Sequence, residues 1–281
     1  MKIRFWGVRG SIPAPGPETN RYGGNTACVS IATASGGLVI IDMGTGLMHL
    51  GNALMAQGFA KGQGRASILL SHTHWDHIQG LGFFPPVFVA GNEITLWGPG
   101  GSDHVLEEIL EGQMDPNFSP LQTLKNFSAK FEVHAAPLDR TFEAEGLTIT
   151  AREHPHGNTT ALAFRIEERG RVFVYASDVG YLDAGVAPPE AIAHYRGAHV
   201  LLHDTTYKPE DQATRRNRGF SSWDEACDAA RAAQVERLVT FHYDQDYSDD
   251  DVDAIIEACR ARLAGSGVQV VPAREGDELE I

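Results

Sequence analysis

The sequence has little positive charge for its length. Its 281 residues include 37 Asp and Glu but only 23 Lys and Arg, which gives a formal net charge of −14. Proteins that bind long nucleic acids normally present a basic face, because contacts with phosphates supply much of their affinity. A basic patch is also what attracts a protein to an anionic membrane surface. The composition therefore argues against a long nucleic acid or a membrane as the partner of this chain.

Cysteines and long apolar runs are also scarce. The three cysteines, Cys28, Cys227 and Cys259, are far apart and form no CxxC pair, which is typical of a reducing compartment. The first residues show no basic segment followed by an apolar stretch, so we expect no signal peptide. The most apolar stretch, residues 68–70, is far shorter than the ~20 residues needed to cross a bilayer. We therefore predict a cytoplasmic protein.

What the sequence does contain is a series of short strand-like runs interrupted by helical patterns. The helical patterns cover residues 45–57, 102–111, 222–233 and 248–263, and the last two open with a Ser that is followed three residues later by an acid. Strands followed by helices, twice over, predict an αββα sandwich: two mixed β-sheets packed face to face with helices on the outer faces. No linker divides residues 1–281, so we expect a single domain. The expected strands are 2–6, 27–33, 38–42, 66–71, 94–97, 131–135, 147–151, 161–166, 172–176, 200–203, 238–241 and 268–271.

The strongest chemical signal directly follows one of the apolar strands. The pattern HxHxDH places four potential metal ligands, His72, His74, Asp76 and His77, within six positions. Alternate residues at a strand end share a face, so His72 and His74 can point the same way. Imidazole and carboxylate ligands without thiolate suit Zn, Mn or Fe. The pattern therefore predicts a metal site.

With this motif the sequence resembles the metallo-β-lactamase superfamily, of which HxHxDH is the signature. The likeness extends over nearly the whole chain. Residues 5–13, 21–26, 39–46 and 200–207 look like the branch that includes ribonuclease Z and small phosphodiesterases. The resemblance implies the αββα fold of the superfamily and a hydrolytic activity.

The resemblance also implies where the remaining ligands lie. Members of the superfamily carry a later His before one strand, a bridging Asp after another, and a last His at the end of a third. The matching positions are His156 or His154 for the first, with His156 preferred for its spacing, then Asp178 and His242. An Asp at the end of an early strand supports the metal loop in relatives, and Asp42 is expected to do so here. A role as a turn or helix-cap residue is the alternative for Asp42.

The implied centre holds two divalent ions, which we expect to be Zn²⁺, with Mn²⁺ or Fe²⁺ as alternatives. Two ions ~3.5–4 Å apart lower the pKa of a shared water toward ~7 and stabilise an in-line displacement, so no nucleophilic Ser or Cys is required. The expected ligands are His72, His74 and His156 for one ion, Asp76, His77 and His242 for the other, and Asp178 with a hydroxide between the two.

The expected substrate is a small or cyclic nucleotide phosphodiester. The branch-specific segments and the absence of thiolate ligands favour it, although the fold itself does not decide the substrate. The alternatives are a hydrolase of lactones, carboxylic esters or thioesters, and a metal-binding sensor without catalysis. Ribonuclease Z enzymes hold transfer RNA with a basic, Gly-rich arm, and this sequence shows no such insertion. The family often pairs into homodimers, so two copies of the chain are a possible assembly.

Further residues have two interpretations each. Arg215 and Arg218, in the one basic run of the chain, are candidates for gripping a phosphate, with a solvated loop as the alternative. Relatives carry a helpful His where this chain has Phe220, so that assistance is either missing here or supplied by His203 or an arginine. We take Asp76 and His203 as candidate catalytic residues, and a purely structural role for His203 carries equal weight.

The apolar segment at residues 81–88 is the last feature with two interpretations. It could form a wall on which a nucleobase stacks, since aromatic side chains bind bases by stacking. More often, such a run belongs to the core or to a contact between subunits. The sequence favours the second interpretation.

Overall fold

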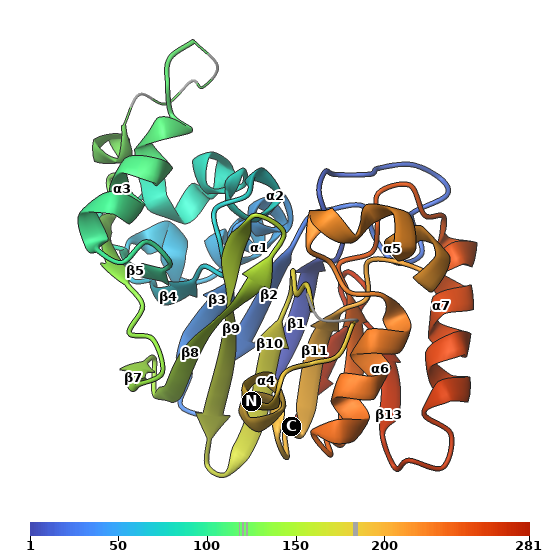
Figure 1. Ribbon diagram of the computed structural model, residues 1–281. Helices are drawn as coiled ribbons and strands as arrows, with labels where there is room; N and C mark the ends of the chain where they lie inside the picture. The colour runs from blue at the N-terminus through green and yellow to red at the C-terminus, as the bar shows by residue number, and fades with distance from the viewer. Residues whose placement is uncertain (118, 120, 122, 182–184) are drawn as a thin grey trace.

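Two mixed sheets of seven strands each make up the centre of the computed structural model, which describes residues 1–117, 119, 121, 123–181 and 185–281. The sheets lie face to face, and helices cover their outer sides (Figure 1). The predicted αββα sandwich is confirmed. The prediction of a single domain over residues 1–281 stays a prediction.

The first sheet has the order β14-β1-β2-β3-β4-β5-β6. Pairing is antiparallel from β14 to β3 and parallel from β3 to β6. The last strand of the chain therefore lies beside the first, and the amino group of Met1 donates a hydrogen bond to the carbonyl of Ile281 at 3.0 Å. The strands are β1 (Lys2–Gly7), β2 (Cys28–Ala32), β3 (Leu38–Ile41), β4 (Arg65–Leu69), β5 (Glu93–Gly98), β6 (Lys130–Ala135) and β14 (Glu278–Glu280).

The second sheet has the order β13-β12-β11-β10-β9-β8-β7. It repeats the plan of the first, because β7 to β10 are antiparallel and β10 to β13 are parallel. The strands are β7 (Thr141–Ala144), β8 (Leu147–His156), β9 (Thr159–Glu168), β10 (Arg171–Ala176), β11 (Val200–Asp204), β12 (Arg237–Phe241) and β13 (Gln269–Pro272).

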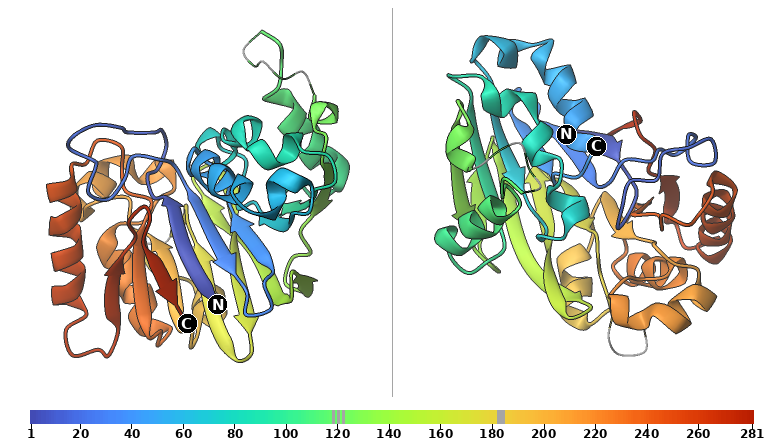
Figure 2. Two further views of the ribbon diagram at one scale, coloured as in Figure 1. Left: turned by 180° about the vertical axis from the view of Figure 1, so that it is seen from behind. Right: turned by 90° about the horizontal axis from the view of Figure 1, so that it is seen from above.

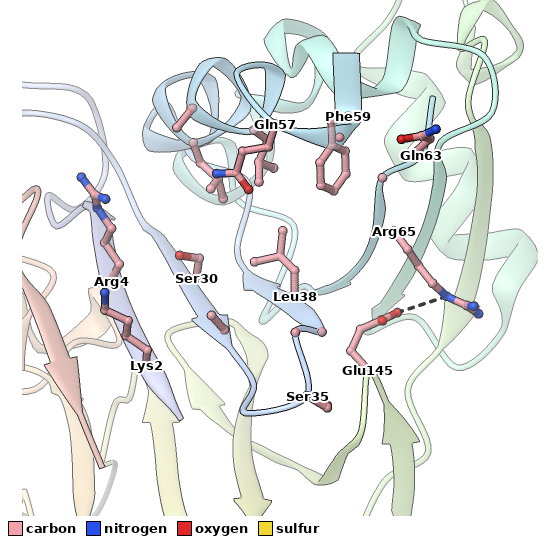
Figure 3. A pocket seen from close by; sticks show the side chains of 18 of the residues that line it. Lys2, Arg4, Ser30, Ser35, Leu38, Gln57, Phe59, Gln63, Arg65 and Glu145 are labelled. Atoms are coloured by element: carbon pink, nitrogen blue, oxygen red, sulfur yellow. Dashed lines mark ion pairs between the residues drawn. The ribbon is translucent and has the colours of Figure 1, made fainter. Parts of the chain in front are cut away.

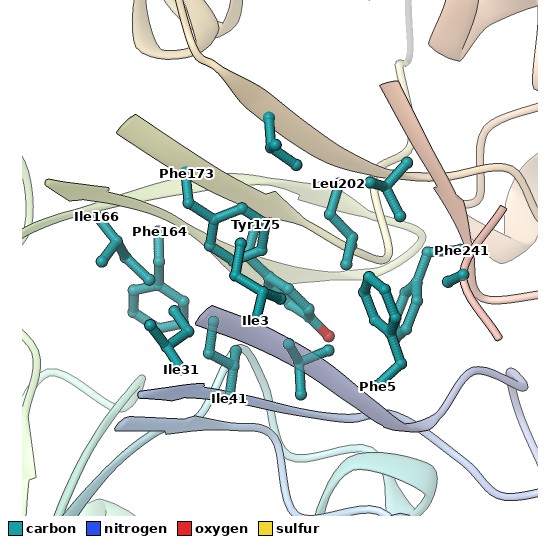
Figure 4. Packing of buried hydrophobic residues seen from close by; sticks show 14 of the residues in the cluster. Ile3, Phe5, Ile31, Ile41, Phe164, Ile166, Phe173, Tyr175, Leu202 and Phe241 are labelled. Atoms are coloured by element: carbon teal, nitrogen blue, oxygen red, sulfur yellow. The ribbon is translucent and has the colours of Figure 1, made fainter. Parts of the chain in front are cut away.

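The main core fills the space between the two sheets. Strand β1 shows how the sequence produces it: Ile3 and Phe5 point inward, while Lys2 and Arg4 point outward, as the two-residue period of a strand requires. Side chains from both sheets meet there (Figure 4). Burying an aliphatic or aromatic side chain contributes about 1.5–3 kcal/mol, so this layer is a large source of stability.

Helices lie on the outer faces of the two sheets (Figure 2). The side chains that they bury against the sheets form a second and a third core.

The helix cap predicted at Ser248 is present, since the Ser248 hydroxyl accepts a hydrogen bond from the Asp251 backbone N–H at 3.2 Å. Short 3-10 turns occur at Gly58–Lys61, Leu81–Phe83, Pro85–Phe88, Leu124–Asn126 and Arg216–Arg218. Against the first sheet lie α1 (Gly46–Met55), α2 (Trp75–Ile78) and α3 (Asp103–Gly112); toward the second lie α4 (Pro189–Tyr195), α5 (Pro209–Arg215), α6 (Trp223–Ala232) and α7 (Asp249–Arg262).

Several short elements were not expected from the sequence. Strands β7 and β14 have four and three residues, and α2, α4 and α5 have four to seven. Elements this short hold too few residues to show a period, and tertiary contacts decide their conformation. No helix in the described ranges has the length and apolar character of a membrane span.

Candidate functional site

The predicted ligands meet at one edge of the sandwich, where several strands end. His72 follows β4, His156 ends β8, Asp178 follows β10 and His242 follows β12. Strand β8 runs parallel to β10, because both are antiparallel to β9. Its carboxyl end therefore lies at the same edge as that of β10. A hydrogen bond from the Leu162 backbone N–H to the Ser71 carbonyl, at 2.8 Å, joins the two sheets at this point.

The first group of side chains consists of three histidines. The ring centroids of His72, His74 and His156 lie 4.5 to 4.9 Å apart, and His156 Nε2 is 3.1 Å from His74 Nδ1. His72 and His156 are buried, whereas His74 is exposed. One ring nitrogen of each residue lies within 4.8 Å of the others. The group is therefore open to solvent on the side of His74.

The second group consists of Asp76, His77, Asp178 and His242, all of them buried. Asp76 Oδ2 lies 3.3 Å from the Nε2 atoms of both His77 and His242. It also accepts a hydrogen bond from the backbone N–H of Ser11 at 2.7 Å. Residues from four separate segments thus converge on one point.

Asp178 lies between the two groups. Its Oδ1 is 3.8 Å from His72 Nε2 and 3.6 Å from His156 Nε2, both in the first group. The same oxygen is 3.3 Å from His242 Nε2, and Oδ2 is 3.2 Å from His77 Nε2. A carboxylate with oxygens facing both groups can contact two ions at once.

The electrostatics favour cations at this point. Burial by itself would raise the pKa of Asp178, but the His242, His77 and His72 rings outweigh it and hold that pKa well below its usual range. Burial opposes charge on the His242 ring, yet Asp178 and Asp76 raise its pKa to about 9. Both carboxylates therefore stay ionised, and positive charge beside them is stabilised.

The donor set fits divalent metal ions. The buried Nε2 atoms of His72 and His77 have no hydrogen-bond partner among the described residues, although buried ring nitrogens normally have one. A metal ion would satisfy both. Imidazole and carboxylate donors around such a point are those that Zn²⁺ and related ions prefer.

Asp42 lies behind the cluster and contacts residues of the metal-binding motif. Its buried carboxylate accepts from the Ser71 N–H at 2.7 Å, the Ser71 hydroxyl at 2.8 Å and the Tyr175 hydroxyl at 2.6 Å. The fourth contact is His77 Nδ1, at 2.8 Å. This contact suits a proton on Nδ1 that faces Asp42, which leaves Nε2 directed toward the cluster to bind a metal ion.

The backbone is strained at three of these strand ends. Asp42, Asp178 and His242 have φ values of 61°, 59° and 60°, in the left-handed region that side chains other than glycine rarely adopt. Such conformations cluster where a function requires a particular side-chain direction. Here each one turns a strand-end side chain into the centre.

The sequence did not reveal the residues that orient His242. The Thr206 hydroxyl lies 2.9 Å from His242 Nδ1, and Asp204 accepts from the Thr206 backbone N–H at 2.8 Å. A Cβ atom at Gly10 would fall 2.3 Å from the His242 ring, so only glycine fits there. The sequence indicates that residues 200–207 resemble one branch of the superfamily, but only the fold shows which of these residues contact the centre.

The structure brings His156, rather than His154, to the cluster. His156 donates from Nδ1 to the Gly219 carbonyl at 2.8 Å and faces the first group through Nε2. His154 points elsewhere, with Nε2 donating to the Ser177 carbonyl at 3.2 Å, and burial lowers its pKa to about 4. The geometry agrees with the preference for His156; that either residue binds an ion stays a prediction.

This difference gives a direct test. We expect His156→Gln to weaken metal binding at least about tenfold, because a ligand and its anchor to Gly219 are both lost. His154→Gln is the matched control and should keep the metal content of the parent chain. The measurement is metal content after dialysis against a graded chelator series. Equal retention in both variants, or loss only in His154→Gln, would contradict the assignment.

His203 is not brought to the cluster. Its Nδ1 donates to the Asp204 carbonyl at 2.7 Å, and its Nε2 lies 2.7 Å from the Tyr181 hydroxyl. The Tyr195 ring packs against it at 5.9 Å, and burial lowers its pKa to about 4. Both ring nitrogens are thus occupied away from the centre, and the geometry supports the structural interpretation of His203 over the catalytic one.

The basic run lies beside the site, and Arg215 and Arg218 both make contacts within the chain. Arg215 Nη1 is 3.5 Å from Asp244 Oδ2 and lies over the Tyr207 ring. Arg218 is exposed and also contacts Tyr207. The side chain of Arg216 lies outside the described part of the structure. Contact of Arg215 or Arg218 with a phosphate stays a prediction.

The Phe220 ring lies against histidines of both groups. Its ring centroid is 5.0 Å from that of His156 and 5.2 Å from that of His242, so it covers both groups. The preceding Gly219 has a φ of 78° and would clash with the Gly157 backbone if it carried a Cβ. The loop therefore approaches the centre closely and presents an apolar side chain to it.

A separate hollow of about 940 Å³ lies on the outer face of the first sheet (Figure 3). Its walls include Leu38 and Arg65, which begin the strands whose far ends lead to the cluster. Its charges are paired: Lys2 lies 2.5 Å from Glu278, and Arg65 lies 3.6 Å from Glu145. Because the hollow lies at the beginning of these strands, it is distinct from the candidate centre at their far ends.

Comparison with known proteins places these observations in a family. The family model described as "Beta-lactamase superfamily domain" matches residues 39–243. Ribonuclease BN of Escherichia coli O7:K1 is 26% identical over 298 residues, covering 93% of this chain and 95% of that protein.

Two solved structures share the fold over the whole chain. The metallo-beta-lactamase fold protein YhfI from Bacillus subtilis has a TM-score of 0.73 at 20% identity and is covered to 98%. A diphosphatase from the PhnP family has a TM-score of 0.67 at 19% identity and is covered to 97%. At these identities the likeness shows the fold alone. The family match, which spans more than half of the chain and includes the HxHxDH motif, shows that this chain belongs to the metallo-β-lactamase superfamily.

Proposed function

We propose that this protein is a dinuclear metal-dependent phosphodiesterase that acts on small or cyclic nucleotide diesters. The observation that carries the proposal is the position of Asp178, whose two oxygens face a trihistidine group on one side and Asp76, His77 and His242 on the other. That arrangement suits two ions. Membership of a hydrolase superfamily supports the reaction class.

Two divalent ions held there, with Zn²⁺ as our first choice, would supply Lewis acidity and an activated water for in-line displacement at phosphorus. The chain's own residues would position the reactants. His74 is the exposed member of the cluster, so the diester would approach from its side. Burial by itself would raise the pKa of Asp76, but the His77 and His242 rings outweigh it and hold that pKa well below its usual range, so Asp76 would act as an ionised ligand and not as a general acid.

The apolar ring of Phe220 cannot give a proton to the leaving group. The side chain covers His156 and His242, where relatives have a histidine. Good leaving groups need little protonation. We therefore expect aryl diesters to be cleaved faster than diesters with simple alkoxide leaving groups.

The charge of the chain supports a small substrate. With a net charge of −14, long polyanions would be repelled from most of the surface, whereas a single diester need only reach the centre. The exposed Arg218 beside the site offers one positive group for its phosphate.

The second candidate function is ribonuclease activity, which the likeness to ribonuclease BN over most of both chains favours.

The test uses the full chain, freed of metal and reloaded with Zn²⁺, Mn²⁺ or Fe²⁺ in separate samples. Substrates are bis-p-nitrophenyl phosphate, 2′,3′- and 3′,5′-cyclic nucleotides, a transfer RNA precursor, a lactone and a thioester. We expect turnover of the small diesters with at least one of the ions. Clear hydrolysis of the lactone or thioester without diester cleavage would refute the proposal, and cleavage of the RNA alone would favour the second candidate.

A further inference from the structure

Exposed apolar side chains gather around α2, beside the metal-binding motif. Trp75 is 80% exposed, Phe83 59% and Ile109 40%. Trp75 is part of the motif itself, and the other three tryptophans of the chain are only partly exposed. Clustered exposed apolar groups on a soluble domain usually mark a binding surface.

These side chains line a groove of about 720 Å³, which lies within the size range of small-molecule sites. No charged side chain lines it among the described residues. Its occupant is therefore uncharged where it contacts the walls. The groove residues that matter here are Thr73, Trp75, Gln79, Phe83, Ile109 and Gln113.

Helix α2 separates this groove from the metal cluster. Trp75 and Ile78 line the groove, while Asp76 and His77 point into the cluster. Residues three apart share a helix face, so the residues that line the groove and those that point into the cluster occupy different faces of this single helical turn. Thr73 and Trp75 also flank His74, the exposed cluster residue. The groove is therefore directly next to the open side of the centre.

The groove also offers a hydrogen bond that nothing uses. Gln113 Nε2 is buried and has no partner within the described part of the chain. A buried amide nitrogen without a partner is unfavourable, so a turn of the Gln113 side chain that presents this nitrogen to an acceptor atom of a ligand in the groove would be favoured. Aromatic walls with an unpaired amide donor match a flat heterocycle.

We propose that this groove binds the nucleobase, or an equivalent aromatic ring, of a nucleotide diester whose phosphate lies at the metal cluster. The inference rests on the proposed function and names the part of the substrate that gives specificity. Trp75 and Phe83 supply the stacking faces, and Gln113 supplies the donor. Of the two interpretations of residues 81–88, the structure assigns Leu81, Phe84 and Val87 to the core and leaves Phe83 free to line the groove.

The kinetic test compares two diesters with the same leaving group. Thymidine 5′-p-nitrophenyl phosphate carries a base, and methyl p-nitrophenyl phosphate does not. We expect Trp75→Ala to lower kcat/KM for the thymidine ester about 5- to 100-fold, the range of base–aromatic stacking, with less than a twofold change for the methyl ester. Phe83→Ala should act in the same direction. Leu138→Ala is the control, because Leu138 is 41% exposed but lies outside the groove.

A binding test keeps the inference independent of turnover. Adenosine 5′-monophosphate should quench the fluorescence of Trp75 in the parent protein, and inorganic phosphate should not. In Trp75→Phe the quenching should disappear, although binding measured by calorimetry persists.

Each alternative outcome is decisive. Equal losses on both diesters, or no loss on either, would overturn the inference. If the parent protein cleaves neither diester, the proposed function fails, and the nucleotide-quenching result alone decides the groove. If Trp75→Ala separates a dimer while nucleotide binding is unchanged, a second copy of the chain covers the groove and the inference is wrong.

Discussion

Replacing Asp178 with asparagine is expected to lower kcat/KM for a phosphodiester by about 10³-fold or more. This loss corresponds to about 4 kcal/mol, the scale of the charge stabilisation that metal ions supply in a transition state. The carboxylate faces His72 and His156 on one side and His77 and His242 on the other. Asparagine keeps one acceptor oxygen but replaces the other with a donor and removes the negative charge, so it would hold two cations much less tightly.

The same substitution should leave the fold in place. Asp178 has a φ of 59°, and Asn is among the few residues that tolerate the left-handed region. The measurements are the content of bound metal, which should fall from two ions per chain to one or fewer, steady-state kinetics and circular dichroism.

Asp246→Asn provides a matched control. Asp246 is exposed and lies four residues after His242, so the variant removes the same charge close to the centre without touching it. Surface substitutions of this kind change free energies by less than about 0.5 kcal/mol, and activity should stay within about twofold of the parent. An Asp178→Asn protein that retained two ions and full turnover would refute the dinuclear centre.

The second large effect is expected at Asp42. Asp42→Asn should weaken metal binding 10- to 100-fold, the usual result of losing a partner that orients a ligand, and should destabilise the fold by about 2 kcal/mol or more. Each oxygen of Asp42 accepts from at least one donor, and Oδ2 alone faces Ser71, His77 and Tyr175.

Neither orientation of the substituted amide would satisfy these donors. With the amide nitrogen toward His77, the ring must become an acceptor at Nδ1, which moves its proton to Nε2 and removes a metal ligand. With the amide reversed, two donors face each other at the Ser71 N–H. Denaturant unfolding and metal titration measure the two effects.

Asp139→Asn is the control for the Asp42 variant. It tests whether the expected destabilisation comes from the side-chain contacts of Asp42 or from its positive φ. Asp139 also has a positive φ, of 54°, but its side chain is 59% exposed and pairs only with Arg152. A surface ion pair contributes at most about 1 kcal/mol, so this variant should be nearly neutral. Similar destabilisation in the Asp139 and Asp42 variants would show that the supporting role assigned to Asp42 is wrong.

Much of the fold could be predicted because it depends on local patterns. Each of the twelve expected strands corresponds to a strand of the structure, with shifts at the ends. Strand β14 was missed because three residues are too few to establish an alternating pattern, and their pairing with β1 spans most of the chain. Helix α2 was missed because the motif it carries indicates a strand end and a turn.

The centre shows the same division between local and distant information. The HxHxDH spacing places four ligand candidates within six consecutive positions, so the sequence alone indicates these members of the two groups. The contact of Asp76 with the Ser11 backbone, and that of His242 with Thr206, join residues far apart in the chain. His203 illustrates the limit most clearly. A His at the end of an apolar strand has the same local pattern whether it faces the centre or, as here, Tyr181.

The left-handed backbone at three strand ends has a consequence for engineering. A common route to a more stable protein replaces non-glycine residues of positive φ with glycine, which relieves about 1–2 kcal/mol of steric cost at each position. In this chain the approach is sound at turn residues such as Arg169 and Gln234, with φ of 50° and 55°. Applied by dihedral angle alone, it would also select Asp42, Asp178 and His242. The resulting protein would have a relaxed backbone but would lack side chains that form and support the candidate metal centre, so stability and metal binding are expected to compete at these three positions.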